Sequence, residues 1–322
     1  MSSTVLRSAR VALAAASSLM AFGLLALLVW TALSSGILGG IVSHGLRSAL
    51  TTLMGEDAFW VVVTFLMVVF GSFAGHFAFF GAMHFSHDGK RIKFFTAAAR
   101  VNHLIAALAC STLILTGATM MAAAAPGTRE ILEGTGLVRV IWHIHAITAI
   151  VFASTVVFML PTWATSMLPK RHDLGWFKIA GGYLSRERRP IPAHKFNAGQ
   201  KMWFWTSTLG GLVLGTTGLL MHLFVGGSSF LNGVALVHHL TATVLVVMFG
   251  VHHYMVLFAI KGSLRAMVDG YKSEEEVSIL HSLYYKEIAS LEPKAAVTEA
   301  LAPAEAPEPL DPEVADPDTP AA

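Results

Sequence analysis

The sequence predicts an all-α integral membrane protein in which about six helices cross the bilayer. Two observations support this fold class. Only 13% of the 322 residues are charged, about half the share found in soluble domains, and the mean hydropathy is +0.62. Six apolar runs are each long enough to cross a hydrocarbon core of about 30 Å. Because backbone groups in lipid must bond to one another, each run is expected to be a helix.

The expected membrane spans occupy residues 11–34, 58–83, 101–124, 140–168, 202–225 and 233–260. The first span follows two arginines and ends in small residues, a pattern that also suits a cleaved signal sequence. Its length argues against cleavage, and cleavage would leave the other spans unchanged.

Basic residues mark one side of the membrane. Lys and Arg gather before the first span and in the segments 90–100, 170–201 and 261–272, whereas the other loops hold only Arg47, Arg129 and Arg139. Loops rich in Lys and Arg stay in the cytoplasm. We therefore expect a multi-pass protein of the bacterial inner membrane, surrounded by lipid, with both termini in the cytoplasm.

Several classes of protein are excluded by composition. A net charge of +2 gives no reason to expect a nucleic-acid partner. A single cysteine, Cys110, excludes an intrachain disulfide and an iron–sulfur cluster held by cysteines of this chain. The C-terminal residues 291–322 are rich in Ala, Pro, Asp and Glu, so we expect a disordered tail there.

The sixth span carries two histidine doublets, His238-His239 and His252-His253. Histidine in hydrocarbon is costly, so its presence there indicates a function. Fourteen residues separate the doublets, so corresponding positions point only about 40° apart around the helix and share a face. They lie roughly 21 Å apart along the axis. Two haems stacked in a helical bundle require imidazoles at two such depths.

Partner histidines occur at matching depths on other spans. His103 begins the third span on the cytoplasmic side, and His145 begins the fourth span on the opposite side. The expected pairs are therefore His103 with His252 and His145 with His238. Neighbouring positions face different sides of a helix, so three alternates stay open: His143, His239 and His253.

The remaining histidines have a less specific interpretation. A lone histidine near a helix end is usually an interfacial or hydrogen-bonded residue, and this applies to His44, His76, His84, His87, His172, His194 and His281. His222 also lies near a helix end, without an evident partner, and stays open as a further candidate ligand. The pairs Thr116-Gly117 and Thr217-Gly218 lie within spans, where small residues let helices or a flat macrocycle approach closely.

From about residue 100 to 287 the chain resembles the gamma subunit of respiratory formate dehydrogenase, the cytochrome b556 family. The resemblance is carried by Arg-Val-Asn-His at 100–103 with Gly117, and by Lys-Phe-Asn-Ala-Gly-Gln-Lys at 195–201 followed by Phe-Trp at 204–205. It continues through His238, His252-His253-Tyr254, and Lys-Gly-Ser-Leu-Arg-Ala-Met-Val-Asp-Gly at 261–270.

This resemblance implies four core helices, two b haems and a menaquinone or ubiquinone site near the cytoplasmic haem. It also implies docking to an iron–sulfur beta subunit, which itself binds a molybdenum- or tungsten-containing alpha subunit. By position in the motifs, the haem ligands are His103, His238, His252 and one of His145 or His143. The quinone pocket is lined by Asn197, Gly199 and Gln200.

The chemistry of these three residues suits a quinone. Asn197 is a good helix N-cap and can also donate a hydrogen bond to a quinone carbonyl. Gln200 lies one helical turn onward, and Gly199 gives a headgroup room to approach the backbone.

The chain thus divides into an N-terminal extension with two spans (1–95), a di-haem domain (96–290) and the tail (291–322). The expected function is electron transfer from a periplasmic iron–sulfur subunit to quinone, with no formate chemistry in this chain. One alternative is the b-type subunit of another quinone-linked enzyme, such as a hydrogenase or thiosulfate reductase. The other is a haem-free anchor or transporter whose histidines relay protons.

Overall fold

The computed structural model describes residues 58–123 and 135–301, and five helices in these ranges are long and apolar enough to cross a membrane. They are α4 (Ala58–Phe80), α5 (Ala97–Ala123), α7 (Leu137–Met167), α9 (Ala198–His222) and α10 (Ser228–Tyr254). The five expected spans between residues 58 and 260 are therefore confirmed. The first expected span lies outside the described residues.

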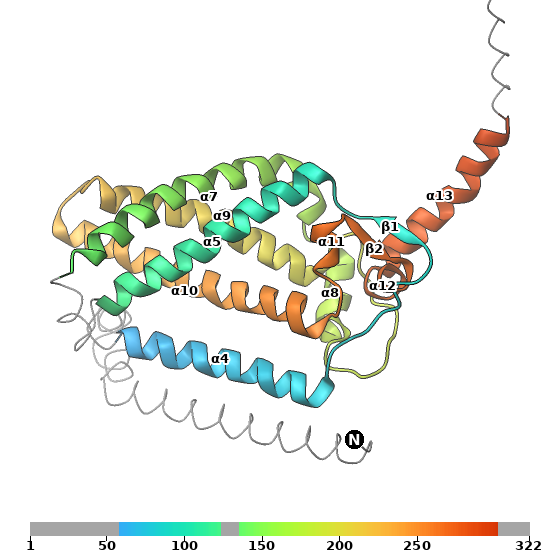
Figure 1. The fold of residues 1–322 in the computed structure, drawn as a ribbon, viewed down its shortest axis with the longest axis horizontal. Helices are drawn as coiled ribbons and strands as arrows, with labels where there is room; N and C mark the ends of the chain where they lie inside the picture. Colours follow the sequence, from blue (N-terminus) through green and yellow to red (C-terminus); the bar gives the residue numbers. More distant parts are fainter. Residues whose placement is uncertain (1–57, 124–134, 302–322) are drawn as a thin grey trace, which may run out of the picture.

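Four of these helices form the bundle shown in Figure 1. Helix α5 packs against α7, α7 against α9, and α9 against α10, while α4 lies along the outer side of α10. Small residues such as Ala106 and Ala109 are buried between the helices, and large ones such as Leu115 and Ile150 are about 70% exposed (69% and 70%). This arrangement is stable only where lipid covers the outer surface.

The contact between α4 and α10 depends on a glycine. A Cβ atom added to Gly250 would overlap the ring of Phe70, so only glycine lets the two helices approach this closely. Phe73 then stacks on Tyr254 with ring centres 4.8 Å apart. After Tyr254, α10 continues into one π-helical turn, η2 (Met255–Ala259).

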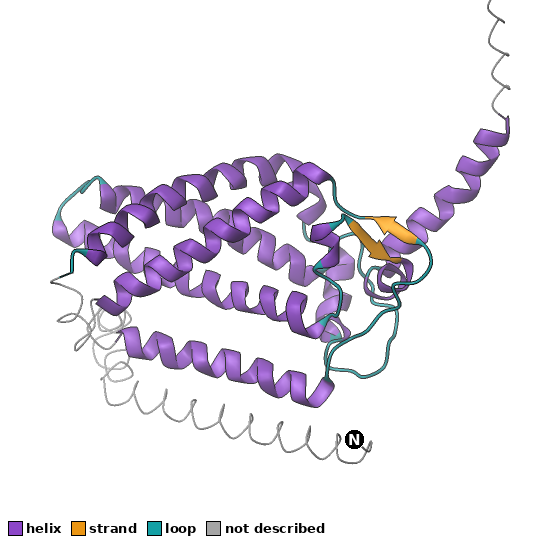
Figure 2. Cartoon of the chain, in the orientation of Figure 1, coloured by secondary structure: helices purple, strands orange, loops and turns teal. Residues whose placement is uncertain are grey.

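Short elements form a cap at the end of the bundle where α5 and α9 begin and α10 ends (Figures 1 and 2). They are β1 (Arg91–Lys93), α8 (Arg171–Lys178), η1 (Ala180–Gly182), α11 (Arg265–Val268), β2 (Tyr271–Ser273), α12 (Glu274–Leu280) and α13 (Ser282–Leu301). The two strands are antiparallel, with Arg91 opposite Ser273. The cap contains the segments 90–100, 170–201 and 261–272, in which Lys and Arg gather.

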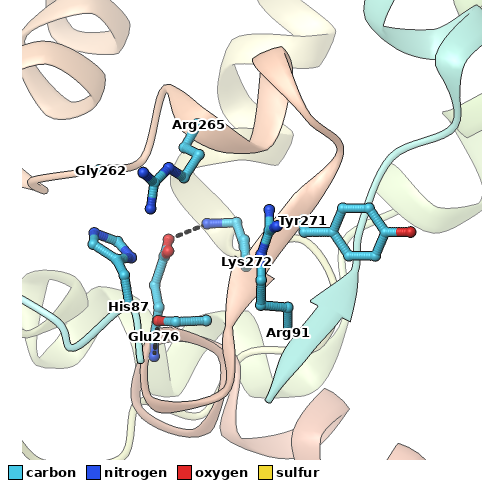
Figure 3. A pocket seen from close by; sticks show the side chains of 8 residues that line it. His87, Arg91, Gly262, Arg265, Tyr271, Lys272 and Glu276 are labelled. Atoms are coloured by element: carbon cyan, nitrogen blue, oxygen red, sulfur yellow. Dashed lines mark hydrogen bonds and ion pairs between the residues drawn. The ribbon is translucent and has the colours of Figure 1, made fainter. Parts of the chain in front are cut away.

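Buried ion pairs hold the cap together. Lys272 on β2 bonds Glu276 on α12, four residues onward, and both side chains are almost fully buried. Figure 3 shows this pair with Arg265 and His87 around the same carboxylate, lining a cavity of only about 10 Å³. A second pair joins α8 to α9, because Lys201 Nζ lies 3.0 and 2.8 Å from the two carboxylate oxygens of Asp173.

Helix α13 extends into the expected tail, since it continues to Leu301. Residues 291–301 are rich in Ala, Glu and Leu, which are strong helix formers. The acidic, Pro-rich part of the tail begins only after residue 301. Residues 302–322 lie outside the described part of the chain.

Candidate functional site

Two pairs of histidines face each other inside the bundle, one near each end. The ring centres of His103 on α5 and His252 on α10 are 6.2 Å apart. Those of His145 on α7 and His238 on α10 are 6.5 Å apart. The structure thus brings together both pairs that matching depth predicts.

A threonine on the neighbouring helix bonds each histidine of the second pair. Thr116 Oγ1 lies 2.8 Å from Nδ1 of His145, and Thr217 Oγ1 lies 2.8 Å from Nδ1 of His238. Each hydroxyl also lies 2.7 Å from a backbone oxygen one turn earlier, that of Thr112 or Val213.

These bonds assign the tautomer of both rings. A hydroxyl has one hydrogen, and a carbonyl oxygen only accepts, so each threonine donates to its backbone partner. The same hydroxyl must then accept from the imidazole, which places the ring hydrogen on Nδ1. The Nε2 lone pair of His145 and of His238 remains unprotonated and available to a metal.

The glycine beside each threonine lies against the same ring. A Cβ atom at Gly117 would lie 3.5 Å from Cε1 of His145, and one at Gly218 would lie 3.6 Å from Cε1 of His238. On both α5 and α9, the threonine therefore hydrogen-bonds a histidine ring and the glycine beside it lies against the same ring. Sequence reasoning noted both pairs as small residues but missed the hydrogen bonds of the hydroxyls.

The first pair is held by packing instead. The Trp203 indole on α9 stacks on His252 with ring centres 5.2 Å apart and planes inclined by 14°. His103 lies nearly two turns into α5, beside Asn102, whose side-chain amide donates to the backbone oxygen of Thr155 at 3.3 Å. Three helices besides α10 thus position this pair.

The alternates face elsewhere. His143 and His239 are exposed on the outer side of α7 and α10. His253 Nδ1 donates to the Phe249 carbonyl oxygen at 2.9 Å, and its ring lies over Phe249. His222 stacks on Trp142, with ring centres 4.5 Å apart, rather than on another histidine.

The spacing of both pairs suits two imidazoles on one iron. A metal–nitrogen bond of about 2.0 Å on each side, plus roughly 1.1 Å from each nitrogen to its ring centre, separates the ring centres by about 6.2 Å. The observed 6.2 and 6.5 Å agree with this separation within a few tenths of an ångström. The residues present therefore fit two bis-histidine haems.

Asn197 and Gln200 form a capping box at the start of α9. Asn197 Oδ1 accepts from the Gln200 backbone N–H at 2.9 Å, and Gln200 Oε1 accepts from the Asn197 backbone N–H at 3.0 Å. The cap uses both side-chain oxygens, so the amide N–H groups are what remains for a ligand.

Aromatic residues of the cap surround this segment. The Trp176 indole lies 3.1 Å from where a Cβ of Gly199 would be, so the space beside the glycine is filled by that ring. Its Nε1 is buried without a hydrogen-bond partner in the described structure. Tyr183 packs on Trp176 and hydrogen-bonds Asn197, and burial raises the pKa of this tyrosine to about 12.

The prokaryotic cytochrome b561 family matches residues 94–270, which is more than half of the 322 residues. The match contains both histidine pairs and the 195–201 segment. It leaves α4 outside.

Individual relatives are similar over much of their length. The cytochrome b556 subunit of formate dehydrogenase from Haemophilus influenzae is 27% identical over 209 residues, covering 63% of this chain and 85% of that protein. The nitrate-inducible cytochrome b556 subunit from Escherichia coli is 28% identical over 156 residues, covering 47% and 71%. A second formate dehydrogenase cytochrome b556 subunit of E. coli is 24% identical over 199 residues, covering 60% and 92%.

Proposed function

Because this chain belongs to the prokaryotic cytochrome b561 family, we propose that it is the membrane cytochrome b subunit of a respiratory formate dehydrogenase. The observation that carries the proposal is the presence of two histidine pairs, His103 with His252 and His145 with His238. Their ring separations of 6.2 and 6.5 Å each suit one iron. The relatives named as formate dehydrogenase subunits support the choice of complex. Formate itself would be oxidised in another subunit.

Two b haems, held by these couples, would supply one-electron transfer between a periplasmic iron–sulfur subunit and a quinone near the cytoplasmic side. His145 and His238 hold the periplasmic position, and His103 and His252 hold the cytoplasmic one. Fourteen residues of α10 separate the two positions, roughly 21 Å along the helix axis.

The protein's own part is to orient the ligands and exclude water. Thr116 and Thr217 fix the tautomer and rotation of the periplasmic imidazoles, because each ring is bonded through Nδ1 and can turn only by breaking that bond. Trp203 covers one face of His252 and keeps its ring aligned.

The quinone role of Asn197, Gly199 and Gln200 belongs to the same proposal. The capping box leaves the amide N–H groups of Asn197 and Gln200 as donors. The side chain of Asn197 already hydrogen-bonds Tyr183. Gln200 is therefore the better candidate to donate to a quinone carbonyl, whether of menaquinone or ubiquinone. The buried Lys201–Asp173 pair anchors this segment to α8.

The partners follow from the orientation of the bundle. An iron–sulfur beta subunit would dock at the end that carries His145 and His238, and a molybdenum- or tungsten-containing alpha subunit would bind through it. Both termini would lie in the cytoplasm. Reporter fusions ending after Gly270 should then be active only with a cytoplasmic reporter, and fusions after Gly226 only with a periplasmic one.

Spectroscopy of the purified membrane complex tests the proposal. Formate should reduce a b-type cytochrome in the complex, and a quinone analogue with an oxidised headgroup should reoxidise it. A matched control is His222→Ala, which removes an imidazole that lies outside both couples and should leave the spectrum unchanged. A complex with no b-type spectrum, or one reduced by hydrogen but not by formate, would overturn the assignment.

A further inference from the structure

A cavity of about 240 Å³ lies where the end of α4 meets the loop after η1, at the cap end of the bundle (Figure 1). Its walls are formed by His76 and residues 79–83, by parts of the 183–188 loop, and by Ala259 at the end of η2. The wall that α4 forms lies outside the residues 94–270 that the family match covers. Pockets for drug-sized ligands measure about 300–1,000 Å³, so this cavity suits a smaller polar group.

The walls of this cavity carry one positive charge that no carboxylate neutralises. Arg188 Nη1 lies 3.1 Å from Glu275 Oε1, and Glu187 Oε2 lies 2.5 Å from Arg189 Nη2, so these four side chains form two ion pairs. Arg186 also lines the cavity, and no carboxylate of the described residues pairs with it. The cavity therefore favours an anion.

Two side chains of the loop have hydrogens available to such an anion. Arg186 donates to the Phe79 carbonyl oxygen at 2.5 Å and lies over the Phe79 ring, which fixes the guanidinium and uses one of its five N–H groups. Ser185 Oγ accepts from the Glu187 backbone N–H at 3.1 Å, so its own hydrogen is left to donate. Both ring nitrogens of His76 are bonded to tyrosine oxygens, so this residue forms only a wall. A guanidinium beside a hydroxyl suits the oxygens of a phosphate.

The position of the cavity relative to the bilayer indicates where that phosphate comes from. Helix α4 is long and apolar enough to cross a membrane and ends at Phe80, so the cavity lies near the depth of phospholipid headgroups. Phe79 on its wall is 56% exposed, and Leu184, next to Ser185, is 61% exposed. Exposed apolar side chains at this depth are covered by lipid, so an acyl chain and a headgroup can reach the same place. Basic pockets beside membrane helices attract anionic lipids.

We propose that this cavity binds the headgroup phosphate of an anionic phospholipid, with Arg186 and Ser185 as its hydrogen-bond donors. The acyl chains of that lipid lie along the exposed apolar side of α4. An anionic lipid is preferred to a zwitterionic one, because the latter would bring a second cation close to Arg186. The bound phosphate links α4 to the 183–188 loop. This inference depends on the membrane placement of α4 and not on the haems or on formate.

The test uses the full-length protein, purified with its bound partners and stripped of lipid by detergent. Phosphatidylglycerol is titrated in, and native mass spectrometry counts the molecules bound. One molecule per chain should bind more tightly than the others. Arg186→Gln removes the charge but keeps an amide donor for the Phe79 oxygen, and it should lower the affinity for that molecule roughly tenfold or more. The matched control is Arg171→Gln, which removes the same charge from an exposed residue outside the cavity and should leave the affinity unchanged.

Two further ligands identify the source of the phosphate. Phosphatidylcholine carries the same phosphate with a quaternary ammonium group, and it should bind the unaltered protein several times more weakly. Inorganic phosphate at the same concentration as the lipid should not displace phosphatidylglycerol. Displacement by inorganic phosphate would assign the cavity to a soluble anion and overturn the lipid assignment, and so would equal binding of the two lipids.

A second variant keeps the proposal testable if Arg186→Gln does not assemble. Ser185→Asp retains a side-chain oxygen that can accept from the Glu187 backbone N–H, and it places a carboxylate in the cavity wall. Repulsion between the carboxylate and the phosphate should abolish the tight binding of phosphatidylglycerol. Unchanged affinity in Ser185→Asp or in Arg186→Gln overturns the inference.

Discussion

The Thr116 hydroxyl accepts a hydrogen bond from Nδ1 of His145 at 2.8 Å, and so the imidazole presents its unprotonated nitrogen to the interior of the bundle. Thr217 and His238 repeat this relationship at the same distance. A hydrogen bond of this kind makes a metal-bound imidazole a stronger electron donor. The potential of a haem held by this couple should therefore depend on two hydroxyl groups.

Replacing Thr116 by Val tests this dependence, because the side chain keeps its shape and loses the hydroxyl. The midpoint potential of one haem should rise by on the order of 40 mV, the one-electron equivalent of about 1 kcal/mol. Thr217→Val should act on the same haem in the same direction. A redox titration measures the shift, and Thr112→Val, which removes a hydroxyl that bonds only its own helix, is the control.

Loss of one ligand should remove one haem. His252→Ala takes away an imidazole of the cytoplasmic couple, so haem content should fall from two per chain to one, and quinone reduction should stop. The periplasmic haem should remain reducible by formate. His253→Ala is the matched control on the next residue, and haem quantitation that drops there but not in His252→Ala would reverse the choice between them.

The quinone site can be tested without removing the helix cap. Gln200→Glu keeps the oxygen that caps Asn197 and loses the amide donor, whereas Gln200→Leu loses both. A hydrogen bond to a neutral carbonyl is worth on the order of 1 kcal/mol, so both variants should bind a quinone analogue roughly fivefold to tenfold more weakly.

The haem spectra decide how that result is interpreted. They should be unchanged in both Gln200 variants, because Gln200 is not an axial ligand. Analogue titration in membranes with unaltered affinity would remove the quinone role. Altered haem spectra in Gln200→Leu alone would show that Gln200 acts mainly by capping the N-terminus of α9.

The cap of short elements at the end of the bundle, which includes α12 and α13, should loosen on acidification because of His281. Burial, with a further contribution from Lys272, lowers the pKa of His281 to about 3, and the ring bonds the His194 backbone oxygen at 3.0 Å. Its unfolded value is 6.5, so below that pH the opened cap binds a proton that the closed cap does not. Closure is fully stable above pH 6.5 and weakens by up to about 1.4 kcal/mol for each pH unit below it.

Hydrogen exchange of α12 at several pH values measures this effect. Protection should be constant above pH 6.5 and decrease toward pH 5. His281→Asn can keep a donor to the His194 oxygen and does not titrate, so its protection should vary less with pH. Equal pH dependence in both proteins would assign the effect to other groups.

The membrane spans could be read from the sequence because hydropathy is a local property. A run of about 20 apolar residues must cross the bilayer as a helix whatever its neighbours do. The depth of each histidine was predictable for a similar reason, since an α-helix rises by a fixed amount per residue. Hence the pairing of His103 with His252, and of His145 with His238, could be inferred before any contact was known.

Only the tertiary structure shows which way each helix faces. Which of His145 and His143, and which of His238 and His239, points into the bundle depends on rotation of the helix about its axis, which packing sets. The hydroxyl of Thr116 meets His145 because α5 and α7 pack closely at Gly117, and His76 meets Tyr254 because Gly250 admits the Phe70 ring. These contacts join residues far apart in sequence, so local hydropathy and helical period contain no information about them.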